Sequence, residues 1–252
     1  MIRMLSDKEK FKLENLKNWH KNTDYWLNNP LRQVEDTKYF FKPKLKDLVS
    51  PNMSILDMGC GSGWLLDFLI ELQVPFTYKG IDFNKKFITH LNKKYQALPN
   101  ASFETVDFEQ EIPVHLINEF DLVFNCFNFF ETANLDSAFD NAQKMKKEQG
   151  KLVIFTIDNM YLILGVSKTM EDLNKNLKTY EQLKRNDETP YFFQNIDLGD
   201  AESEDLKYAS VLYSFGDYYK KAREYNMNLI DYGEIVKTSK YIPKIYQYIV
   251  FQ

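Results

Sequence analysis

Residues 55–66 read Ile55-Leu56-Asp57-Met58-Gly59-Cys60-Gly61-Ser62-Gly63-Trp64-Leu65-Leu66, an apolar run that ends in an acid and then breaks into three alternating glycines. The pattern predicts a strand, a tight turn and the start of a helix. Glycine has no Cβ, so it can adopt positive φ and let a ligand lie against the backbone, while the free N–H groups of the new helix face that ligand. The acid stands at the carboxyl edge of the predicted sheet, where open α/β folds bind cofactors. The turn is therefore predicted to hold a ligand.

Two further predicted strands also end in an acidic residue. Residues 77–83 predict a second strand that reaches Asp82, 19 residues after Gly63. Residues 101–108 predict a third strand that ends in Asp107 and an aromatic residue. The separation along the chain between the glycines and Asp82 is typical of an acid that binds a ribose diol. We therefore expect three aspartates side by side at one edge of a sheet.

The C-terminal sequence separates two kinds of cofactor-binding domain. Residues 228–236 and 244–251 read as strands, with only the seven residues 237–243 between them. So short a segment cannot hold a crossover helix, and the last strand must run antiparallel to its neighbour. A domain that binds a nicotinamide or flavin dinucleotide usually ends in parallel strands, and its turn usually spaces the last glycine differently. The hairpin therefore argues against a dinucleotide site.

At this point the chain resembles the class I S-adenosylmethionine-dependent methyltransferases of the type that acts on small molecules. Their first motif is an acid followed by three alternating glycines, matched here by Asp57, Gly59, Gly61 and Gly63. Their next two strands each supply an acid. The resemblance covers residues 50–158 well and the remainder loosely. It implies an α/β fold with a doubly wound, seven-stranded, mostly parallel sheet whose last strand is antiparallel.

The resemblance also implies the cofactor and the residues that hold it. The cofactor is S-adenosylmethionine. The glycine turn approaches its methionine part, Asp82 binds both ribose hydroxyls, and Asp107 accepts a hydrogen bond from the adenine amino group, between apolar walls formed by Phe83 and Phe108. The full set of expected cofactor-binding residues is Asp57, Gly59, Cys60, Gly61, Gly63, Asp82, Phe83, Asp107, Phe108 and Asn125.

Two segments outside the core are expected to cover the site, within a single domain of residues 1–252. Residues 1–48 predict an N-terminal helical lid, and residues 159–214 predict an inserted helix and hairpin that form a cap. Small-molecule methyltransferases that resemble this chain place such elements over the methyl donor, so substrate choice is expected there. The candidate substrate-binding residues are Tyr25, Trp26, Phe130, Asp158 and Tyr213.

His20 is the candidate catalytic residue. Methyl transfer is an in-line displacement, in which the principal task of an enzyme is alignment in a dry pocket. A hydroxyl acceptor would also benefit from a base that works near neutral pH, and His20 is the histidine in the predicted lid. The alternative for a histidine on an amphipathic helix is a surface or packing role.

Composition argues against several other classes of protein. The net charge of −4 argues against nucleic acid as a partner, because such binding depends on clustered Lys and Arg. No run reaches the roughly 18 apolar residues that span a bilayer, and the N-terminus lacks a signal-peptide core, so we expect a cytoplasmic protein without membrane contact. The 2 cysteines and 3 histidines lack the spacing of metal ligands, so no metal is expected.

These observations predict an enzyme that transfers a methyl group from S-adenosylmethionine to an oxygen or nitrogen atom of a small, partly apolar metabolite. That methyl acceptor is the expected partner, and a monomer or homodimer is the expected assembly. Three alternatives stay open: a methyltransferase for a protein or peptide, an NAD-dependent oxidoreductase, and a cofactor-binding module without catalysis.

Overall fold

The computed structural model describes residues 7–28, 38–158, 163, 169–185, 191–195, 207–237 and 244–252. Its centre is a seven-stranded sheet with the strand order β3-β2-β1-β4-β5-β9-β8. The strands are β1 (Met53–Met58), β2 (Phe76–Asp82), β3 (Ala101–Thr105), β4 (Phe120–Cys126), β5 (Lys146–Ile157), β8 (Leu229–Lys237) and β9 (Lys244–Phe251). Strands β1 to β5 pair in parallel, and β9 runs antiparallel to both β5 and β8. The predicted fold class is confirmed.

Seven helices, two short 3-10 helices and a separate hairpin complete the described part of the chain. The helices are α1 (Asp7–Asn28), α2 (Lys38–Leu48), α3 (Trp64–Glu71), α4 (Lys85–Lys94), α5 (Leu135–Met145), α7 (Met170–Arg185) and α8 (Phe215–Glu224). The 3-10 helices are η1 (Val114–Leu116) and η2 (Phe129–Glu131). Strands β6 (Tyr191–Asn195) and β7 (Lys207–Val211) form an antiparallel hairpin of their own. No helix among these is both long and apolar enough to cross a bilayer.

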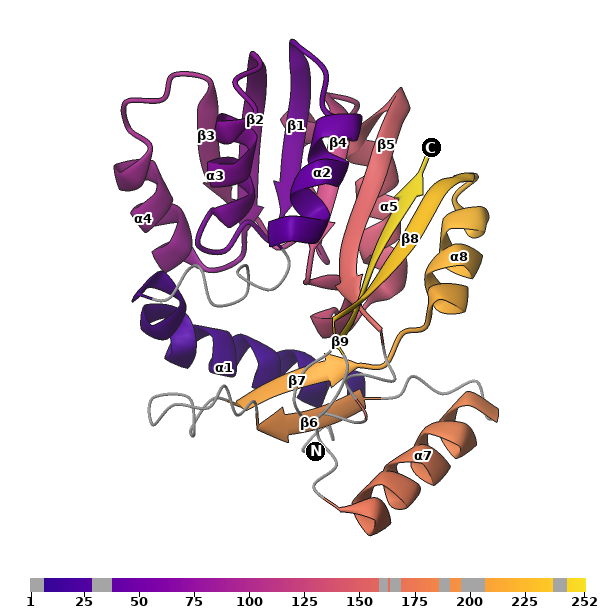
Figure 1. Ribbon diagram of the computed structural model, residues 1–252. Helices are drawn as coiled ribbons and strands as arrows, with labels where there is room; N and C mark the ends of the chain where they lie inside the picture. Colours follow the sequence, from indigo (N-terminus) through magenta and orange to yellow (C-terminus); the bar gives the residue numbers. More distant parts are fainter. Residues whose placement is uncertain are drawn as a thin grey trace.

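The inner strands β1 and β4 are buried on both faces, which explains their apolar runs. Successive side chains of a strand point to opposite faces. Ile55 accordingly belongs to the apolar layer beneath α2 and α3, and Leu56 belongs to the layer beneath α5 and α8. Figure 1 shows these helices on the two sides of the sheet. Phe41 of α2 stacks on Phe155 of β5 in the first layer, with ring centroids 4.1 Å apart.

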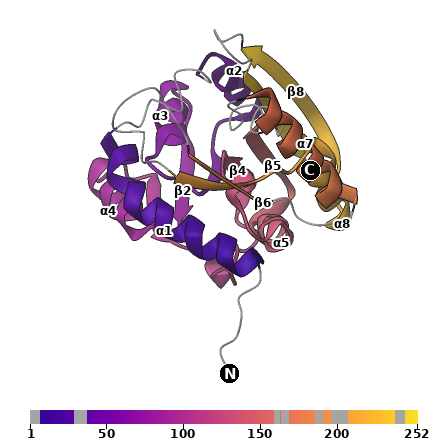
Figure 2. The ribbon, with the colours of Figure 1, turned by 90° about the horizontal axis from the view of Figure 1, so that it is seen from below.

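Helix α1 and the β6–β7 hairpin lie across the carboxyl ends of the parallel strands (Figures 1 and 2). Phe11 of α1 packs on Val211 of β7 at one end of the helix, and Trp26 packs on Phe87 of α4 near the other end. This arrangement places α1 above the glycine turn. The function of residues 1–48 and 159–214 as lid and cap stays a prediction.

One strand is shorter than predicted. Strand β3 ends at Thr105, and the chain then bends so that the Val106 N–H donates to the Asp82 carbonyl. Asp107 therefore lies in the loop after β3 and not in the strand itself. Its side chain still reaches the edge of the sheet next to Asp82, because β3 is the neighbour of β2.

Candidate functional site

The glycine turn between β1 and α3 has the left-handed backbone that the sequence predicts. Gly59, Gly61 and Gly63 have φ angles of +78°, +48° and +83°, which residues with a Cβ rarely adopt. A Cβ on Gly59 would lie 2.6 Å from the Asn128 side chain, whereas a Cβ on Gly61 would meet nothing within 4 Å. Gly61 therefore presents bare backbone to open space, as a turn that cradles a ligand requires.

Asp82 links the second strand to this turn. Its Oδ2 atom accepts a hydrogen bond from the Gly61 N–H at 3.0 Å, and its Oδ1 atom accepts one from the Asn84 N–H at 2.8 Å. Burial raises the pKa of Asp82 to about 6, although the two backbone donors oppose this shift. The carboxyl group thus lies at the pocket wall with its orientation set by the backbone.

Two polar side chains behind the turn keep an atom without a partner in the described structure. The Tyr78 hydroxyl donates to Oδ2 of Asp57 at 2.8 Å, while Oδ1 of Asp57 has no partner. Asn125 accepts a hydrogen bond from the Phe129 N–H, while its Nδ2 atom has no partner. Burial raises the pKa of Asp57 to about 7. Unpaired buried polar atoms are costly, so their presence beside the turn is consistent with a site that a polar ligand completes.

A pocket that is partly open to solvent lies between this edge of the sheet and α1. Six of the expected cofactor-binding residues line it, namely Gly59, Gly61, Asp82, Phe83, Asp107 and Phe108. On the opposite side, α1 contributes one helical face with Lys12, Asn15, Leu16 and Trp19. The remaining lining residues come from other elements and are Phe87, Glu109, Asn128, Glu131, Thr132 and Ala133. The pocket therefore combines four carboxyl groups with one lysine.

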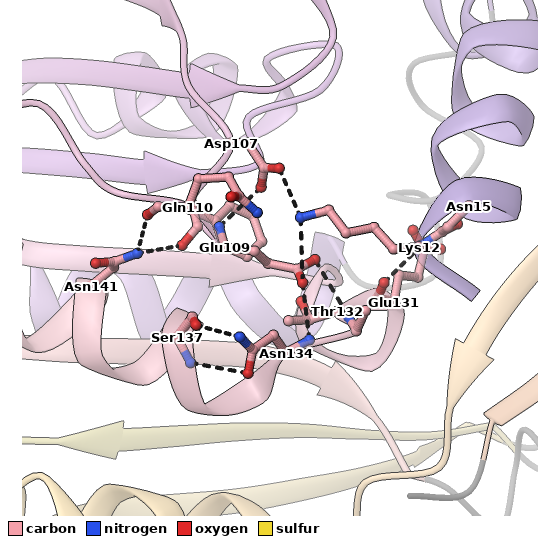
Figure 3. Close-up of polar contacts among 12 residues, drawn as sticks. Lys12, Asn15, Asp107, Glu109, Gln110, Glu131, Thr132, Asn134, Ser137 and Asn141 are labelled. Atoms are coloured by element: carbon pink, nitrogen blue, oxygen red, sulfur yellow. Dashed lines mark hydrogen bonds and ion pairs between the residues drawn. The ribbon is translucent and has the colours of Figure 1, made fainter. Parts of the chain in front are cut away.

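Lys12 connects α1 to the acids beyond β3, as Figure 3 shows. Its Nζ atom lies 2.9 Å from Oδ2 of Asp107 and 3.8 Å from Oε2 of Glu109. Glu109 also accepts hydrogen bonds from the N–H groups of Ala133 and Asn134. Burial raises the pKa of Glu109, and the positive charge of Lys12 opposes this effect. The lysine thus holds the helix against this corner of the pocket.

Glu131, the last residue of η2, makes a second polar contact with α1. The Trp19 indole N–H donates to Oε2 of Glu131 at 2.6 Å, and the Asn15 side-chain amide donates to the Glu131 carbonyl at 2.7 Å. Burial raises the pKa of the Glu131 carboxyl to about 8, against the Trp19 hydrogen bond and with a further contribution from the negative charge of Asp82. This environment therefore favours the neutral form of the carboxyl.

Comparison with known proteins identifies the family. The family described as the methyltransferase domain matches residues 49–228. The chain belongs to the methyltransferase domain family. S-adenosylmethionine is its cofactor, as the resemblance implies, and this match decides against the NAD alternative.

Individual relatives are distant. The chain is 24% identical to 5-methylorsellinic acid synthase of Aspergillus terreus, over 76% of this chain and 8% of that protein. It is 27% identical to polyketide methyltransferase ustM of Ustilaginoidea virens, over 66% of this chain and 41% of that protein. Among solved structures, a SAM-dependent methyltransferase from Methanosarcina mazei has a TM-score of 0.61 at 13% identity, covering 83% of this chain and 96% of that one. The chain spans only 7% and 8% of the length of the first two curated relatives.

The remaining expected cofactor residues of this methyltransferase lie behind the pocket wall. Cys60 and Cys126 are buried free thiols beside the turn, and burial raises the pKa of both. Gly63 precedes α3, and a Cβ there would lie 2.7 Å from Leu91. Asp57 and Asn125 contribute the unpaired atoms described above. Among the described residues, no group of three or more metal-ligand side chains gathers.

The predicted catalytic and substrate residues lie farther out. His20 is exposed, with its ring edge-on to Phe83 at a centroid distance of 5.9 Å. Tyr25 packs edge-on to Trp26 at 5.2 Å. Neither His20 nor these aromatic residues line the described pocket. Their roles stay predictions.

The other substrate candidates make contacts at the rim of the fold. Phe130 packs on Ile163 and Leu212. The Tyr213 hydroxyl donates to the Thr132 carbonyl at 3.2 Å, and Asp158 accepts a hydrogen bond from Gln247 at 3.0 Å. None of the three candidates lines the described pocket, so their contact with substrate also stays a prediction.

The sequence interpretation did not assign roles to Lys12, Trp19, Glu109, Asn128 or Glu131. One signal was available for the helix. Lys12, Asn15, Leu16 and Trp19 follow the i, i+3, i+4, i+7 spacing of one helical face, and this face carries polar side chains where a purely structural helix would be apolar. No comparable signal marks Glu109 or Glu131.

Proposed function

We propose that this protein transfers the methyl group of S-adenosylmethionine to a small organic acceptor bound between the glycine turn and α1. The observation that carries this proposal is the shared pocket, in which Gly61, Asp82 and Asp107 face a helix that covers the strand ends. Four carboxyl groups and one lysine favour a ligand with positive charge. The methyl donor supplies a positively charged sulfur whose methyl group is ready to leave.

The residues of the chain bind and orient the donor. The proposed ribose contact is Asp82, whose carboxyl is already oriented by Gly61 and Asn84. Asp107 is the proposed adenine contact, with Phe83 and Phe108 as apolar walls. Such placement lowers the barrier mainly by alignment and exclusion of water, which can supply several kcal/mol.

The proposed acceptor is a polyketide-like or phenolic compound. Two relatives are named as a polyketide methyltransferase and as 5-methylorsellinic acid synthase, which supports this class. The aromatic lining by Trp19 and Phe87 suits a flat, partly apolar acceptor. The proposed acceptor atom is oxygen, nitrogen or an acidic carbon. A wall formed by α1 favours a small acceptor over a protein side chain, which needs an open site.

Calorimetry and a transfer assay test the proposal together. We expect S-adenosylhomocysteine to bind the purified protein and NAD to give no heat. With S-adenosylmethionine labelled in the methyl group, we expect label to appear in at least one member of a panel of phenols and 1,3-dicarbonyl compounds. Binding without transfer to any acceptor, including peptides, would favour the cofactor-binding module, and failure of the cofactor to bind would refute the proposal.

A further inference from the structure

Glu131 and Asp82 are the two pocket carboxyls without a cationic partner in the described part of the chain. The Glu131 side chain accepts one hydrogen bond, from the uncharged indole of Trp19. Asp107 and Glu109 form ion pairs with Lys12, and Asp82 accepts hydrogen bonds from two backbone N–H groups. Glu131 is therefore the acid whose charge is least compensated in this pocket.

The groups around Glu131 add negative rather than positive charge. The titratable side chains that line the pocket with Glu131 are Lys12 on α1, Asp82 at the end of β2, and Asp107 and Glu109 after β3. His20 on α1 and Tyr213 after β7 lie outside this lining. Lys12 is paired with Asp107, His20 is exposed against Phe83, and the Tyr213 hydroxyl is bonded to the Thr132 carbonyl. Negative charge on Asp82 and burial both favour the protonated form of Glu131.

The backbone and side chain of Glu131 are both fixed from α1. Asn15 holds its carbonyl and Trp19 holds its carboxyl, while Asn128 in the preceding turn donates to the carbonyls of Met58 and Gly59. A carboxyl held in this way keeps its orientation toward the pocket whether or not it is charged. A pre-oriented acid that changes charge with its surroundings is suited to proton transfer.

We propose that Glu131 is the general base of this site, and that the positive charge of the bound methyl donor drives its carboxyl into the ionised form which that task requires. This inference rests on the proposed function. A cation in the pocket favours the carboxylate, so Glu131 gives its proton to solvent when the charged donor binds. The uncharged product, S-adenosylhomocysteine, exerts no such effect.

The proton and electrons balance over one turnover. The Glu131 carboxylate takes the proton from the acceptor O–H, N–H or C–H group. The electron pair left on the acceptor atom forms the bond to the methyl carbon, and the pair of the broken carbon–sulfur bond stays on sulfur, which becomes neutral. Glu131 ends protonated beside a neutral product, as it is in the free protein. The Glu131 carboxylate is therefore present only while the charged methyl donor is bound.

Calorimetric titrations in buffers of different ionisation enthalpy test this coupling without an identified acceptor. At about pH 7 we expect S-adenosylmethionine to release about one proton more than S-adenosylhomocysteine on binding. The difference should vanish above about pH 9, where Glu131 is ionised before binding. It should also vanish in Glu131→Gln. The two ligands differ in the methyl group and the charge of the sulfur, and comparison with Glu131→Gln isolates the part of the proton release that is due to Glu131.

Glu109→Gln is the matched control, because Glu109 lies in the same pocket but is paired with Lys12. This variant should keep the difference in proton release. In the transfer assay, Glu131→Gln should lower the rate constant by about 100-fold while S-adenosylhomocysteine affinity changes little. Unchanged transfer in Glu131→Gln would overturn the assignment of the base.

The unmodified protein provides a test that does not depend on the folding of a variant. The ratio of S-adenosylmethionine affinity to S-adenosylhomocysteine affinity should rise with pH by up to about tenfold per unit below pH 8 and level off above it. A flat ratio, or equal proton release, would overturn the role of Glu131 and leave the proposed function intact. Failure of both ligands to bind would overturn both.

Discussion

The Nζ atom of Lys12 on α1 lies 2.9 Å from Oδ2 of Asp107, the acid to which the family resemblance assigns the adenine amino group. The other oxygen of Asp107 already accepts the Glu109 N–H at 3.0 Å. A hydrogen bond from the adenine amino group to Asp107 would therefore compete with Lys12 and the Glu109 N–H, which already contact the two carboxylate oxygens. Lys12 has a second acid within reach, because Glu109 lies 3.8 Å away.

Lys12→Ala should strengthen cofactor binding by about fivefold, since the lysine competes for Asp107 and its charge opposes a cationic ligand, an effect of the order of 1 kcal/mol for a partly exposed pair. Calorimetry with S-adenosylmethionine measures this change. Lys86→Ala is the control, because Lys86 also tethers α1 through an ion pair, with Asp24, but lies outside the pocket. Weaker binding by Lys12→Ala would show that the lysine supports the cofactor.

Asp82→Ala should weaken cofactor binding by roughly 2 to 3 kcal/mol, the scale of charge-assisted hydrogen bonds, because the carboxyl is the proposed partner of the ribose. Asp67→Ala is a suitable control, since Asp67 contacts Lys94 and Tyr95 away from the pocket. If both variants bind S-adenosylhomocysteine like the unmodified protein, Asp82 has no contact with the ribose.

Gly61→Val should abolish cofactor binding while leaving a folded protein. The side chain would extend into open space rather than into the core, so the structural cost comes from the positive φ of +48° and amounts to about 1 to 2 kcal/mol. Circular dichroism and calorimetry separate the two effects. Gly216→Ala, at a helical position with room for a Cβ, should bind normally.

Asp57 should make the protein less stable as pH rises from about 4 to about 7. Burial raises the pKa of Asp57 from 3.8 to about 7, so in this range the folded state binds more protons than the unfolded state. The free energy of unfolding therefore falls with increasing pH. Urea unfolding at the two ends of the range measures the fall, and Asp57→Asn should reduce it.

Asp121 is the control for the experiment on Asp57, because its pKa is shifted in the opposite direction. Hydrogen bonds from Ser54 and the ion pair with Lys147 lower the pKa of Asp121 despite partial burial. Its ionised form stabilises the folded protein, and that contribution is lost as pH falls through the lowered pKa. Asp121→Asn should therefore leave the decline between about pH 4 and 7 in place. A decline that persists unchanged in Asp57→Asn would locate its origin in other acids.

The strand-end acids and the glycine turn were readable from sequence because their structure is local. Gly59, Gly61 and Gly63 need positive φ within one turn, and the antiparallel end of the sheet follows from the shortness of residues 237–243. The side of the pocket that α1 forms could not be predicted from the sequence in this way. The Lys12–Asp107 contact joins residues 95 positions apart, and the Trp19–Glu131 contact joins residues 112 positions apart. Such contacts depend on where α1 packs, which no local pattern specifies.

The shared face of α1 makes the site sensitive to helical phase. Each residue turns an α-helix by about 100°, so deletion of one residue between Lys12 and Trp19 would leave part of that face pointing away from the strands. The sheet and its acids would survive such a deletion, whereas Lys12 and Trp19 could no longer reach Asp107 and Glu131 together. Substitutions on this one helix can therefore change the charge and hydrogen bonding of the pocket while the α/β scaffold stays the same.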